Sequence, residues 1–425
     1  MLIKNGLLID PKNNIEACYD VRIENGHVTE IENDLTPNDG ETVVDATNQW
    51  IIPGAIDLHV HLREPGFEYK ETIETGARSA AKGGVTTLCA MPNTNPVVDC
   101  KEVVERIYSI AKEKACMNVL QVGAVTKGQK GIELSDIKDM VEAGICALSE
   151  DGRTVMDSKL LKEAMELCKV YNIPMLSHCE DEALAGGAMN EGDVSKKLGL
   201  PGILKAAEDI IASRDIQLAV ATGCKLHLCH VSTKGSVDIL KFSKEHGIQV
   251  TAEVCPHHFS LTDQDVDGIN TNTKMNPPLR EMEDVIALKE GLKNNSIDTI
   301  ATDHAPHHAD EKARAYVNAP NGIIGLETLI PLTLTHLYHE GILSKRQCVE
   351  KLSYNPAKVL GIDKGHLSIG AIADITLIDP ECSYIIEENE IVSKSKNSPF
   401  IGTKVTGKVI ATYVAGQQVY PFTHA

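Results

Sequence analysis

Several features that mark particular classes of protein are missing from this chain of 425 residues. It has no run of about 18 apolar residues, so we expect no membrane-spanning helix. Its 41 basic residues are outnumbered by 60 acidic ones, and the net charge of −19 argues against binding nucleic acid or an anionic membrane by charge. The twelve cysteines include no C-x-x-C pair, and the amino-terminal segment lacks the pattern of a signal peptide. We therefore expect a cytoplasmic protein with reduced thiols.

Both ends of the chain are rich in short strand-like segments and lack long helical periodicity. Within residues 1–52, the turn signals Asn5-Gly6, Asn25-Gly26 and Asp39-Gly40 separate or adjoin such segments. Residues 366–425 show the same character in "ADITLIDP", "YIIEENEIV" and "VTGKVIATYVAGQQVY". We expect the two ends to pair into one small β-sandwich domain.

Residues 53–365 differ, because apolar strand-like runs alternate there with helical stretches such as "SKLLKEAMELCKVYN". The strand-like runs are "AIDLHVHLR", "VTTLCAMPNT", "MNVLQVGAVT", "ICALSEDG", "IPMLSHCED", "KLHLCHVST", "IQVTAEVCPHH" and "DTIATDHAPH". Such alternation predicts a parallel α/β fold. Eight strand–helix units predict a (β/α)8, or TIM-like, barrel.

Polar residues that can bind metals or substrates stand at the carboxyl ends of these runs. They are His59, His61, Asn93, Asp151, His178, His230 and Asp303. A barrel of this type builds its active site from these strand ends and the loops that follow them. Each residue alone has an ordinary explanation, as a structural or solvated histidine or as an aspartate that caps a helix. Their shared position on one rim points to a common site.

The stretch "DLHVHLREPG" places His59, His61 and Arg63 two residues apart, so in a strand their side chains would lie in one row. Two neighbouring imidazoles suggest a metal site, since neutral histidine is the commonest metal ligand. Two hydrogen-bonded core histidines would explain this stretch equally well, because two ligands do not make a complete site.

The four histidines and two aspartates of the rim form a nitrogen and oxygen set that suits zinc and similar divalent ions. The set is large enough for two ions bridged by one carboxylate, for which Asp151 is the candidate. His59, His61 and Asp303 would then hold one ion. His178 and His230 would hold the other. Such ions activate water and polarise a carbonyl group. Asp303 is placed to take a proton and return it to a leaving nitrogen, so the rim predicts hydrolysis of an amide-like bond.

Longer motifs resemble those of the cyclic amidohydrolases in the metal-dependent amidohydrolase superfamily, and specifically of bacterial long-chain (class I) dihydroorotases. "DLHVHLREPG" and "ATDHAPHHADEK" fit the two long signatures of that family. The shorter motifs "AMPNTNP", "LSEDG", "MLSHCED", "LHLCHVST", "VCPHHFSL", "KMNPPLR" and "GIIGLETLIP" occur in the expected order. The resemblance covers nearly the whole chain.

The resemblance implies reversible cyclisation of N-carbamoyl-L-aspartate to L-dihydroorotate plus water, a step of de novo pyrimidine (UMP) biosynthesis. It implies one or two Zn²⁺ ions per subunit, with Asp303 as the general base and acid beside a metal-activated hydroxide. The implied metal ligands are His59, His61, Asp151, His178, His230 and Asp303. The implied substrate-binding residues are His61, Arg63, Asn93, Asn276, His307, Asn321 and Gly322. An arginine suits the exocyclic carboxylate of dihydroorotate, which it can bind in a bidentate way.

The chain departs from the family pattern at Asn321, where relatives commonly have an aromatic residue. Its "CALSEDG" run has no lysine, whereas hydantoinases and dihydropyrimidinases carry a carboxylated lysine there. Another cyclic amidohydrolase, of the hydantoinase or allantoinase type, stays an alternative, although Arg63 argues against it. A non-catalytic homologue that scaffolds aspartate transcarbamoylase is a second alternative, although inactive relatives should lose metal ligands.

Three smaller expectations complete the sequence-based picture. We expect a homodimer that acts on a small molecule, and we also consider an association with aspartate transcarbamoylase. We expect His257 and His258 in "CPHHFSL" to have structural roles. Residues 308–319 lie between two substrate-binding elements and form either a mobile lid or an ordinary surface connection.

Overall fold

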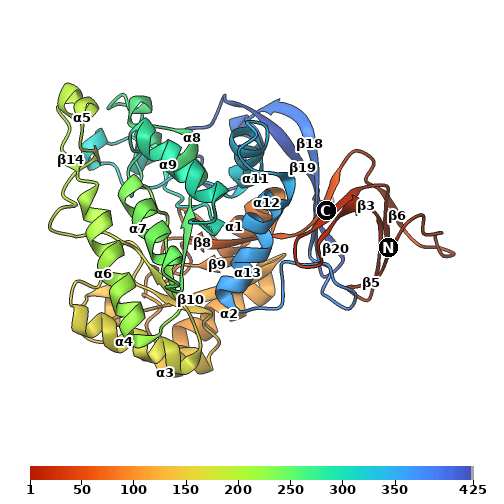
Figure 1. Cartoon of the computed structure of the whole chain (residues 1–425), viewed down its shortest axis with the longest axis horizontal. Coiled ribbons are helices and arrows are strands. Elements are labelled where there is room, and N and C mark those ends of the chain that lie inside the picture. Colours follow the sequence, from red (N-terminus) through yellow and green to blue (C-terminus); the bar gives the residue numbers. More distant parts are fainter. Residues whose placement is uncertain (423–425) are drawn as a thin grey trace.

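Eight parallel strands form a barrel at the centre of the chain (Figure 1), in a computed structural model that describes residues 1–422. Their order in the sheet follows their order in the chain. A parallel bridge between Val60 and His304 joins the first strand to the segment after the last. The strands are β8 (Ala55–Val60), β9 (Val85–Ala90), β10 (Asn118–Ala124), β11 (Ala147–Ser149), β12 (Met175–Ser177), β15 (Leu226–Leu228), β16 (Val250–Val254) and β17 (Thr299–Ile300). Each lies in one of the eight predicted runs, so the predicted barrel is confirmed.

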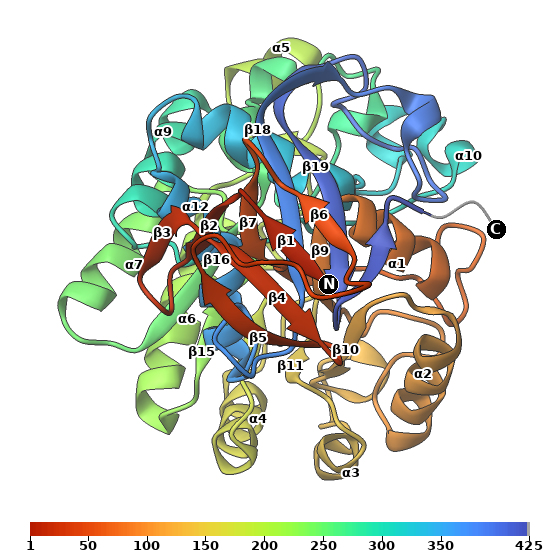
Figure 2. The same ribbon diagram turned by 90° about the vertical axis from the view of Figure 1, so that its right-hand side faces the viewer.

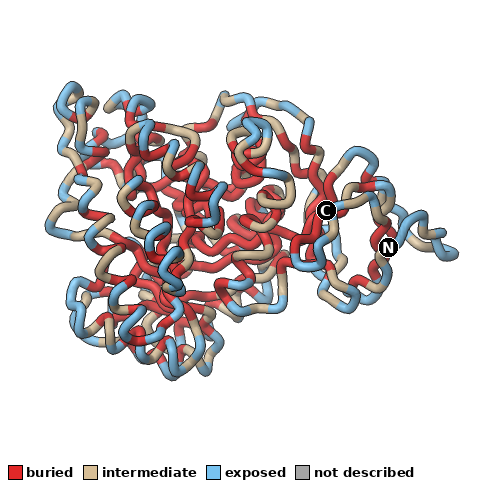
Figure 3. Tube along the Cα trace, viewed as in Figure 1, coloured by how far each residue is buried: buried red, intermediate tan, exposed pale blue. Residues whose placement is uncertain are grey.

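The barrel strands are apolar because both of their faces are covered. All residues of β8 and β9 are buried, including the polar residues Asp57 and His59. The Asp57 carboxylate accepts hydrogen bonds from the backbone N–H groups of His59 and Thr302, each at 3.1 Å. These bonds tie β8 to the segment after β17 and fix both strand ends that carry predicted site residues. Figure 3 shows the buried centre of the barrel in red.

Helices cover the outside of the barrel, and none of those described is long and apolar enough to cross a membrane. The first begins after Thr72, whose hydroxyl accepts the N–H of Thr75 in a capping box. The barrel helices are α1 (Ile73–Lys82), α2 (Lys101–Lys114), α3 (Ile137–Glu142), α4 (Ser158–Tyr171), α6 (Ala206–Thr222), α7 (Lys234–Glu245), α9 (Met282–Lys293), α11 (Leu329–Thr333), α12 (Lys345–Val349) and α13 (Asn355–Leu360). Short elements between them are β13 (Met189–Asn190), α5 (Asp193–Leu198), β14 (Gly202–Ile203), α8 (Pro256–Ser260) and α10 (Ala309–Lys312).

A β-sandwich built from both ends of the chain lies beside the barrel in Figure 1 and in front of it in Figure 2. One sheet has the order β5-β4-β1-β6 and the other β20-β19-β18-β7-β2-β3. Leu8, Ile51 and Leu377 share the buried core between the sheets with Ile23 of the smaller sheet. The strands are β1 (Leu2–Lys4), β2 (Leu7–Asp10), β3 (Ile15–Cys18), β4 (Asp20–Glu24), β5 (His27–Glu32), β6 (Val43–Asp45), β7 (Trp50–Pro53), β18 (Ile375–Ile385), β19 (Lys404–Val414) and β20 (Gln417–Tyr420). The division at 52/53 and 365/366 remains our proposal for the domain boundaries.

The connection between β18 and β19, residues 386–403, leaves the sandwich and contacts the barrel. The backbone N–H groups of Val392 and Ser393 donate to the carboxylate of Glu327 at 2.8 and 2.9 Å. The N–H of Lys394 donates to Glu71, just before α1, at 3.1 Å. The carboxy-terminal part of the chain therefore reaches the loops at the rim of the barrel.

Candidate active site

The six side chains predicted to bind metal meet at the carboxyl ends of five barrel strands, and all are buried. Asp151 lies at their centre. One of its oxygens is 3.1 Å from His59 Nε2 and 3.6 Å from both His178 Nδ1 and His230 Nε2. Its other oxygen is 3.4 Å from His61 Nε2. A single carboxylate therefore faces all four histidines, as a bridging ligand would.

Asp303 closes the other side of the cluster. Its Oδ1 lies 3.1 Å from His61 Nε2 and 3.6 Å from His59 Nε2. Burial raises the pKa of this carboxyl, but the hydrogen bond to His61 and the neighbouring histidine charges hold the pKa below its usual range. Asp303 and His230 have left-handed φ values of 47° and 35°. Such backbone angles are uncommon outside glycine and gather at functional sites.

The donor atoms of this cluster fit a divalent cation. Within residues 1–422, the buried His59 Nε2 makes no hydrogen bond, since its contact with Asp151 lacks hydrogen-bond geometry. In one group, the ligand atoms of His59, His61 and Asp151 lie within 4.8 Å of one another. In a second group, the same holds for Asp151, His178 and His230, so Asp151 belongs to both. Imidazole nitrogens and carboxylate oxygens in this number suit zinc and related ions.

The ring nitrogens that face away from the cluster are held by further polar side chains. His59 Nδ1 lies 2.9 Å from Glu253 Oε1, and His61 Nδ1 lies 2.8 Å from Asn93 Oδ1. His178 Nε2 lies 3.5 Å from Glu180. Such outer partners fix which nitrogen of a ligand histidine is free to bind metal. Asn93 therefore contacts His61, a predicted metal ligand. Its contact with the substrate stays a prediction.

Sequence reasoning missed Glu253, which is completely buried at the end of β16. Besides His59, its carboxylate contacts His227 Nε2 at 3.0 Å and the backbone N–H of His230 at 3.4 Å. Burial would raise the pKa of Glu253, but the hydrogen bonds from His227 and His59 lower it to about 2. Cys229 completes a buried group with His59 and Glu253. The sequence signal that could have indicated Glu253 is the presence of an acidic residue in the apolar run "QVTAEV".

Arg63 lies beside His307 in a group of side chains that also includes Lys70, called the cationic group below. In the predicted row, His59 and His61 both face Asp151, but Arg63 does not belong to it, because β8 ends at Val60 and Arg63 has a φ of 62°. This turn places the guanidinium against the loop after β17. Its Nε donates to Pro306 O at 3.2 Å, and its Nη2 is 3.4 Å from His307 Nε2.

His307 joins the cationic group to the segment that carries Asn321. Its Nε2 donates to Asn321 O at 2.8 Å, and Lys70 Nζ lies 3.3 Å from its Nδ1. Burial and the charges of Arg63 and Lys70 lower the pKa of His307 to about 2. The Glu311 carboxylate lies 3.1 Å from Lys70 Nζ and 3.4 Å from His307 Nδ1. With His307 neutral, the two cations Arg63 and Lys70 outweigh this one carboxylate, and the remaining positive charge suits an anionic group. Lys70 was missed by the sequence analysis.

The other predicted substrate residues differ in how free their polar groups are. Asn276 Nδ2 donates to Glu180 at 3.0 Å, while its buried Oδ1 has no partner in the described part of the chain. The N–H of Gly322 donates to Lys274 O at 3.0 Å, and its carbonyl accepts from Lys312 and Asn397. Gly322 therefore has its backbone hydrogen bonds within the protein.

Residues 308–319 are anchored at several points. Lys312 Nζ donates to Pro320 O at 3.1 Å and to Gly322 O at 3.0 Å. Lys274 Nζ donates to Val317 O and Ala319 O at 2.8 and 2.7 Å. These bonds tie the segment to Lys274 and to residues 320–322, and the mobile lid and the ordinary connection both stay predictions.

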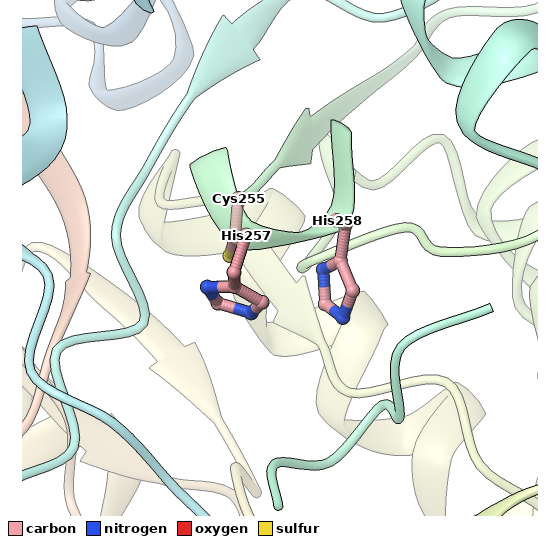
Figure 4. A group of neighbouring side chains, drawn as sticks. All are labelled: Cys255, His257 and His258. Carbon is pink, nitrogen blue, oxygen red and sulfur yellow. The ribbon is translucent and has the colours of Figure 1, made fainter. Parts of the chain in front are cut away.

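A further buried group lies at the start of α8, where Figure 4 shows Cys255, His257 and His258. The two imidazole centroids are 4.2 Å apart. His258 Nε2 donates to Pro277 O at 2.9 Å, and burial lowers the pKa of His258 to about 4. His258 thus supports the segment next to Asn276, which is a structural contact.

Comparisons with known proteins identify the family of the chain. Residues 48–236 match a family model described as dihydro-orotase-like. A dihydroorotase of Pelobacter propionicus is 48% identical over 421 residues, covering 99% of each chain. A dihydroorotase of Acetivibrio thermocellus is 49% identical over 420 residues, covering 99% of this chain and 98% of the relative.

Solved structures of related enzymes share the fold. An L-hydantoinase (dihydropyrimidinase) from Arthrobacter aurescens has a TM-score of 0.88 at 26% identity, covering 98% of this chain and 95% of that one. A D-hydantoinase has a TM-score of 0.86 at 24% identity, with 98% and 94% coverage. With nearly half of its residues identical to dihydroorotases along their whole length, the chain belongs to the dihydroorotase family, whose members are hydrolases acting on cyclic amides.

Proposed function

We propose that this chain is a cytoplasmic dihydroorotase that catalyses the reversible cyclisation of N-carbamoyl-L-aspartate to L-dihydroorotate plus water in de novo pyrimidine biosynthesis. The observation that carries the proposal is the cationic group of Arg63, Lys70 and neutral His307 beside the six-residue cluster. Arg63 is near enough that its charge, after burial, lowers the pKa of His61. A substrate with a carboxylate next to a cyclic amide matches these two neighbouring environments.

We further propose that the cluster holds one or two zinc ions. His59, His61 and Asp303 would bind one ion, His178 and His230 the other, and Asp151 would bridge them. When bound, such ions lower the pKa of water and polarise a carbonyl oxygen. The buried, unpaired Nε2 of His59 supports this assignment.

Asp303 is proposed as the general base and acid. Its depressed pKa keeps the carboxylate ionised, so it can accept a proton during ring opening and return it to the leaving nitrogen. The hydrogen bond with His61 orients the carboxylate toward the centre of the cluster.

The remaining side chains are proposed to bind and orient the substrate. Arg63 binds the exocyclic carboxylate, and Lys70 and His307 are the neighbouring side chains of the cationic group. The unpaired Oδ1 of Asn276 is an acceptor for a ring N–H, and burial makes such a bond costly to lose. Asn93 contacts His61 through its Oδ1 and the backbone carbonyl of Asp151 through its Nδ2, and is proposed to contact the substrate as well. Asn321 contributes its backbone, so the missing aromatic side chain is compatible with binding.

The test is a substrate panel with zinc-loaded protein. We expect the ultraviolet absorbance of dihydroorotate to fall when the enzyme opens the ring. In the reverse assay, which starts from carbamoyl aspartate, the same absorbance should rise. Dihydrouracil, hydantoin and allantoin should react poorly, because they offer no carboxylate placed as in dihydroorotate. Preferential turnover of one of these three would favour the hydantoinase or allantoinase type, and no turnover of any substrate would favour a non-catalytic homologue.

A homodimer and an association with aspartate transcarbamoylase are proposed separately. Light scattering on the purified chain measures the first. Co-purification from the native host, with transcarbamoylase activity as the readout, measures the second. Metal analysis of protein purified without chelators gives the number and identity of the bound ions.

A further inference from the structure

We propose that Asn397, on the connection between β18 and β19, is a positioning residue for the cationic group of Arg63, Lys70 and His307. Its side chain holds together the two loops that carry His307 and Asn321. The inference rests on the function proposed above, because it concerns the side chains assigned to the substrate carboxylate. Asn397 is only 4% exposed, although it lies in a connection between strands of the sandwich.

The Asn397 amide uses its hydrogen-bonding groups on these two loops. Its Oδ1 accepts the backbone N–H of His307 at 3.1 Å. Its Nδ2 donates to Ala305 O and to Gly322 O, each at 3.1 Å. The two amide hydrogens and one acceptor position of this side chain are therefore used. The backbone carbonyl of Asn397 also accepts the N–H of Ile324 at 3.0 Å.

The two loops approach each other closely at this point. Ala305 N donates to Ile323 O at 2.7 Å, and Gly322 has a φ of 128°. A Cβ atom on Gly322 would lie 2.7 Å from Ala305 Cβ and 2.9 Å from Ala305 O. Only glycine allows this approach, and the Asn397 amide bonds to both sides of it. Among the described residues, the His307 N–H and Ala305 carbonyl have no other hydrogen-bond partner.

The segment that carries Asn397 is itself fixed to the barrel. Ser393 and Lys394 donate their backbone N–H groups to Glu327 and Glu71, respectively. Glu71 is completely buried and its Oε2 lies 3.4 Å from His304 Nε2. The contacts of Ser393 and Lys394 therefore fix the segment that carries Asn397, and they are separate from the hydrogen bonds of the Asn397 side chain. Through the His307 N–H it determines where the imidazole stands relative to Arg63.

The test compares two variants with a matched control. Asn397→Asp keeps an oxygen for the His307 N–H but turns a second oxygen toward the carbonyls of Ala305 and Gly322. Asn397→Ala removes all three bonds. Asn389→Ala, at an exposed position of the same connection, is the control.

Turnover is measured first on the wild type, which decides the proposed function by itself. In both Asn397 variants we expect KM for dihydroorotate to rise roughly tenfold or more, because small displacements of binding groups are costly. Zinc content should match the wild type, and kcat should change less than KM. In the double variant with His307→Gln, the two effects on KM should be less than additive, because Asn397 acts through His307. Unchanged KM in both Asn397 variants, or full additivity, would overturn the inference.

Amide hydrogen exchange gives a readout that needs no turnover. In Asn397→Ala, we expect faster exchange at the His307 amide, which loses its acceptor. The Ile324 amide should exchange at the wild-type rate, because it donates to the unchanged backbone carbonyl of residue 397. Equal acceleration at both amides would mean general loosening of the segment and would contradict a positioning role.

Discussion

Replacing Glu253 with glutamine tests whether the carboxylate behind the cluster controls metal binding. Glu253 accepts from His59 at 2.9 Å, from His227 at 3.0 Å and from the His230 backbone at 3.4 Å. Glutamine keeps one oxygen, so one of the two imidazoles must face an NH₂ group in a completely buried place.

The size of the effect follows from these contacts. A buried donor left without an acceptor costs roughly 1–3 kcal/mol. Loss of an outer partner of a metal ligand typically weakens metal affinity by roughly 10–100-fold, which corresponds to about 1.4–2.7 kcal/mol. We therefore expect the zinc Kd of Glu253→Gln to rise by about one to two orders of magnitude.

The assay is competition for zinc against a chromophoric chelator, with thermal melting of the metal-free protein alongside. Glu245→Gln, at the exposed end of α7, is the matched control and should behave as the wild type. A Glu253→Gln protein that melts at a lower temperature but keeps its zinc affinity would refute the reasoning. Glu253 would then support the barrel without acting on His59.

Four other changes probe the proposed roles. Asp303→Asn should reduce turnover to background in a folded protein with an unchanged circular dichroism spectrum, and a substantial residual rate would mean that another group moves the proton. Arg63→Ala should weaken dihydroorotate binding by roughly 2–5 kcal/mol, as expected for a buried charge that loses its partner; unchanged KM and kcat would exclude Arg63 as the carboxylate ligand. His307 has a pKa of about 2 when folded, against 6.5 for the free group. The unfolded chain therefore binds a proton here that the folded chain does not, and stability falls as the pH drops below 6.5. Between pH 7 and pH 5, denaturant titration of His307→Gln should show about 2 kcal/mol less destabilisation than the wild type, and equal losses would contradict the depressed pKa. Metal removal with a chelator should abolish turnover, and zinc should restore it; a metal-free protein with full activity would contradict the assignment of the cluster.

The barrel could be predicted from sequence because its strands are buried on both faces and read as apolar runs. The six residues of the cluster could be predicted for the same reason, since each stands at or just after the end of such a run. The row of His59, His61 and Arg63 could not be predicted correctly, because it depends on where β8 ends. The left-handed backbone of Arg63 has no signal in the pattern of residue types.

Glu253 and Asn397 were missed because their roles depend on partners far away in the chain. Glu253 contacts His59 across 194 residues, and Asn397 contacts His307 across 90. Nothing within a few residues of either position predicts these contacts. Local periodicity describes which face of an element is buried, but it does not say which buried polar groups meet.

The pairing of β7 with β18 has a consequence for the synthesis of the chain. Pro53 lies opposite Ile375, so the amino-terminal strands wait for most of the protein to leave the ribosome before their sheet is complete. During that time the edge of β7 is open, and such edges favour aggregation. Asn397 emerges later still, after the whole barrel. A growing chain should therefore lack the hydrogen bonds that Asn397 makes to the loops of His307 and Gly322 until its last tenth has been made.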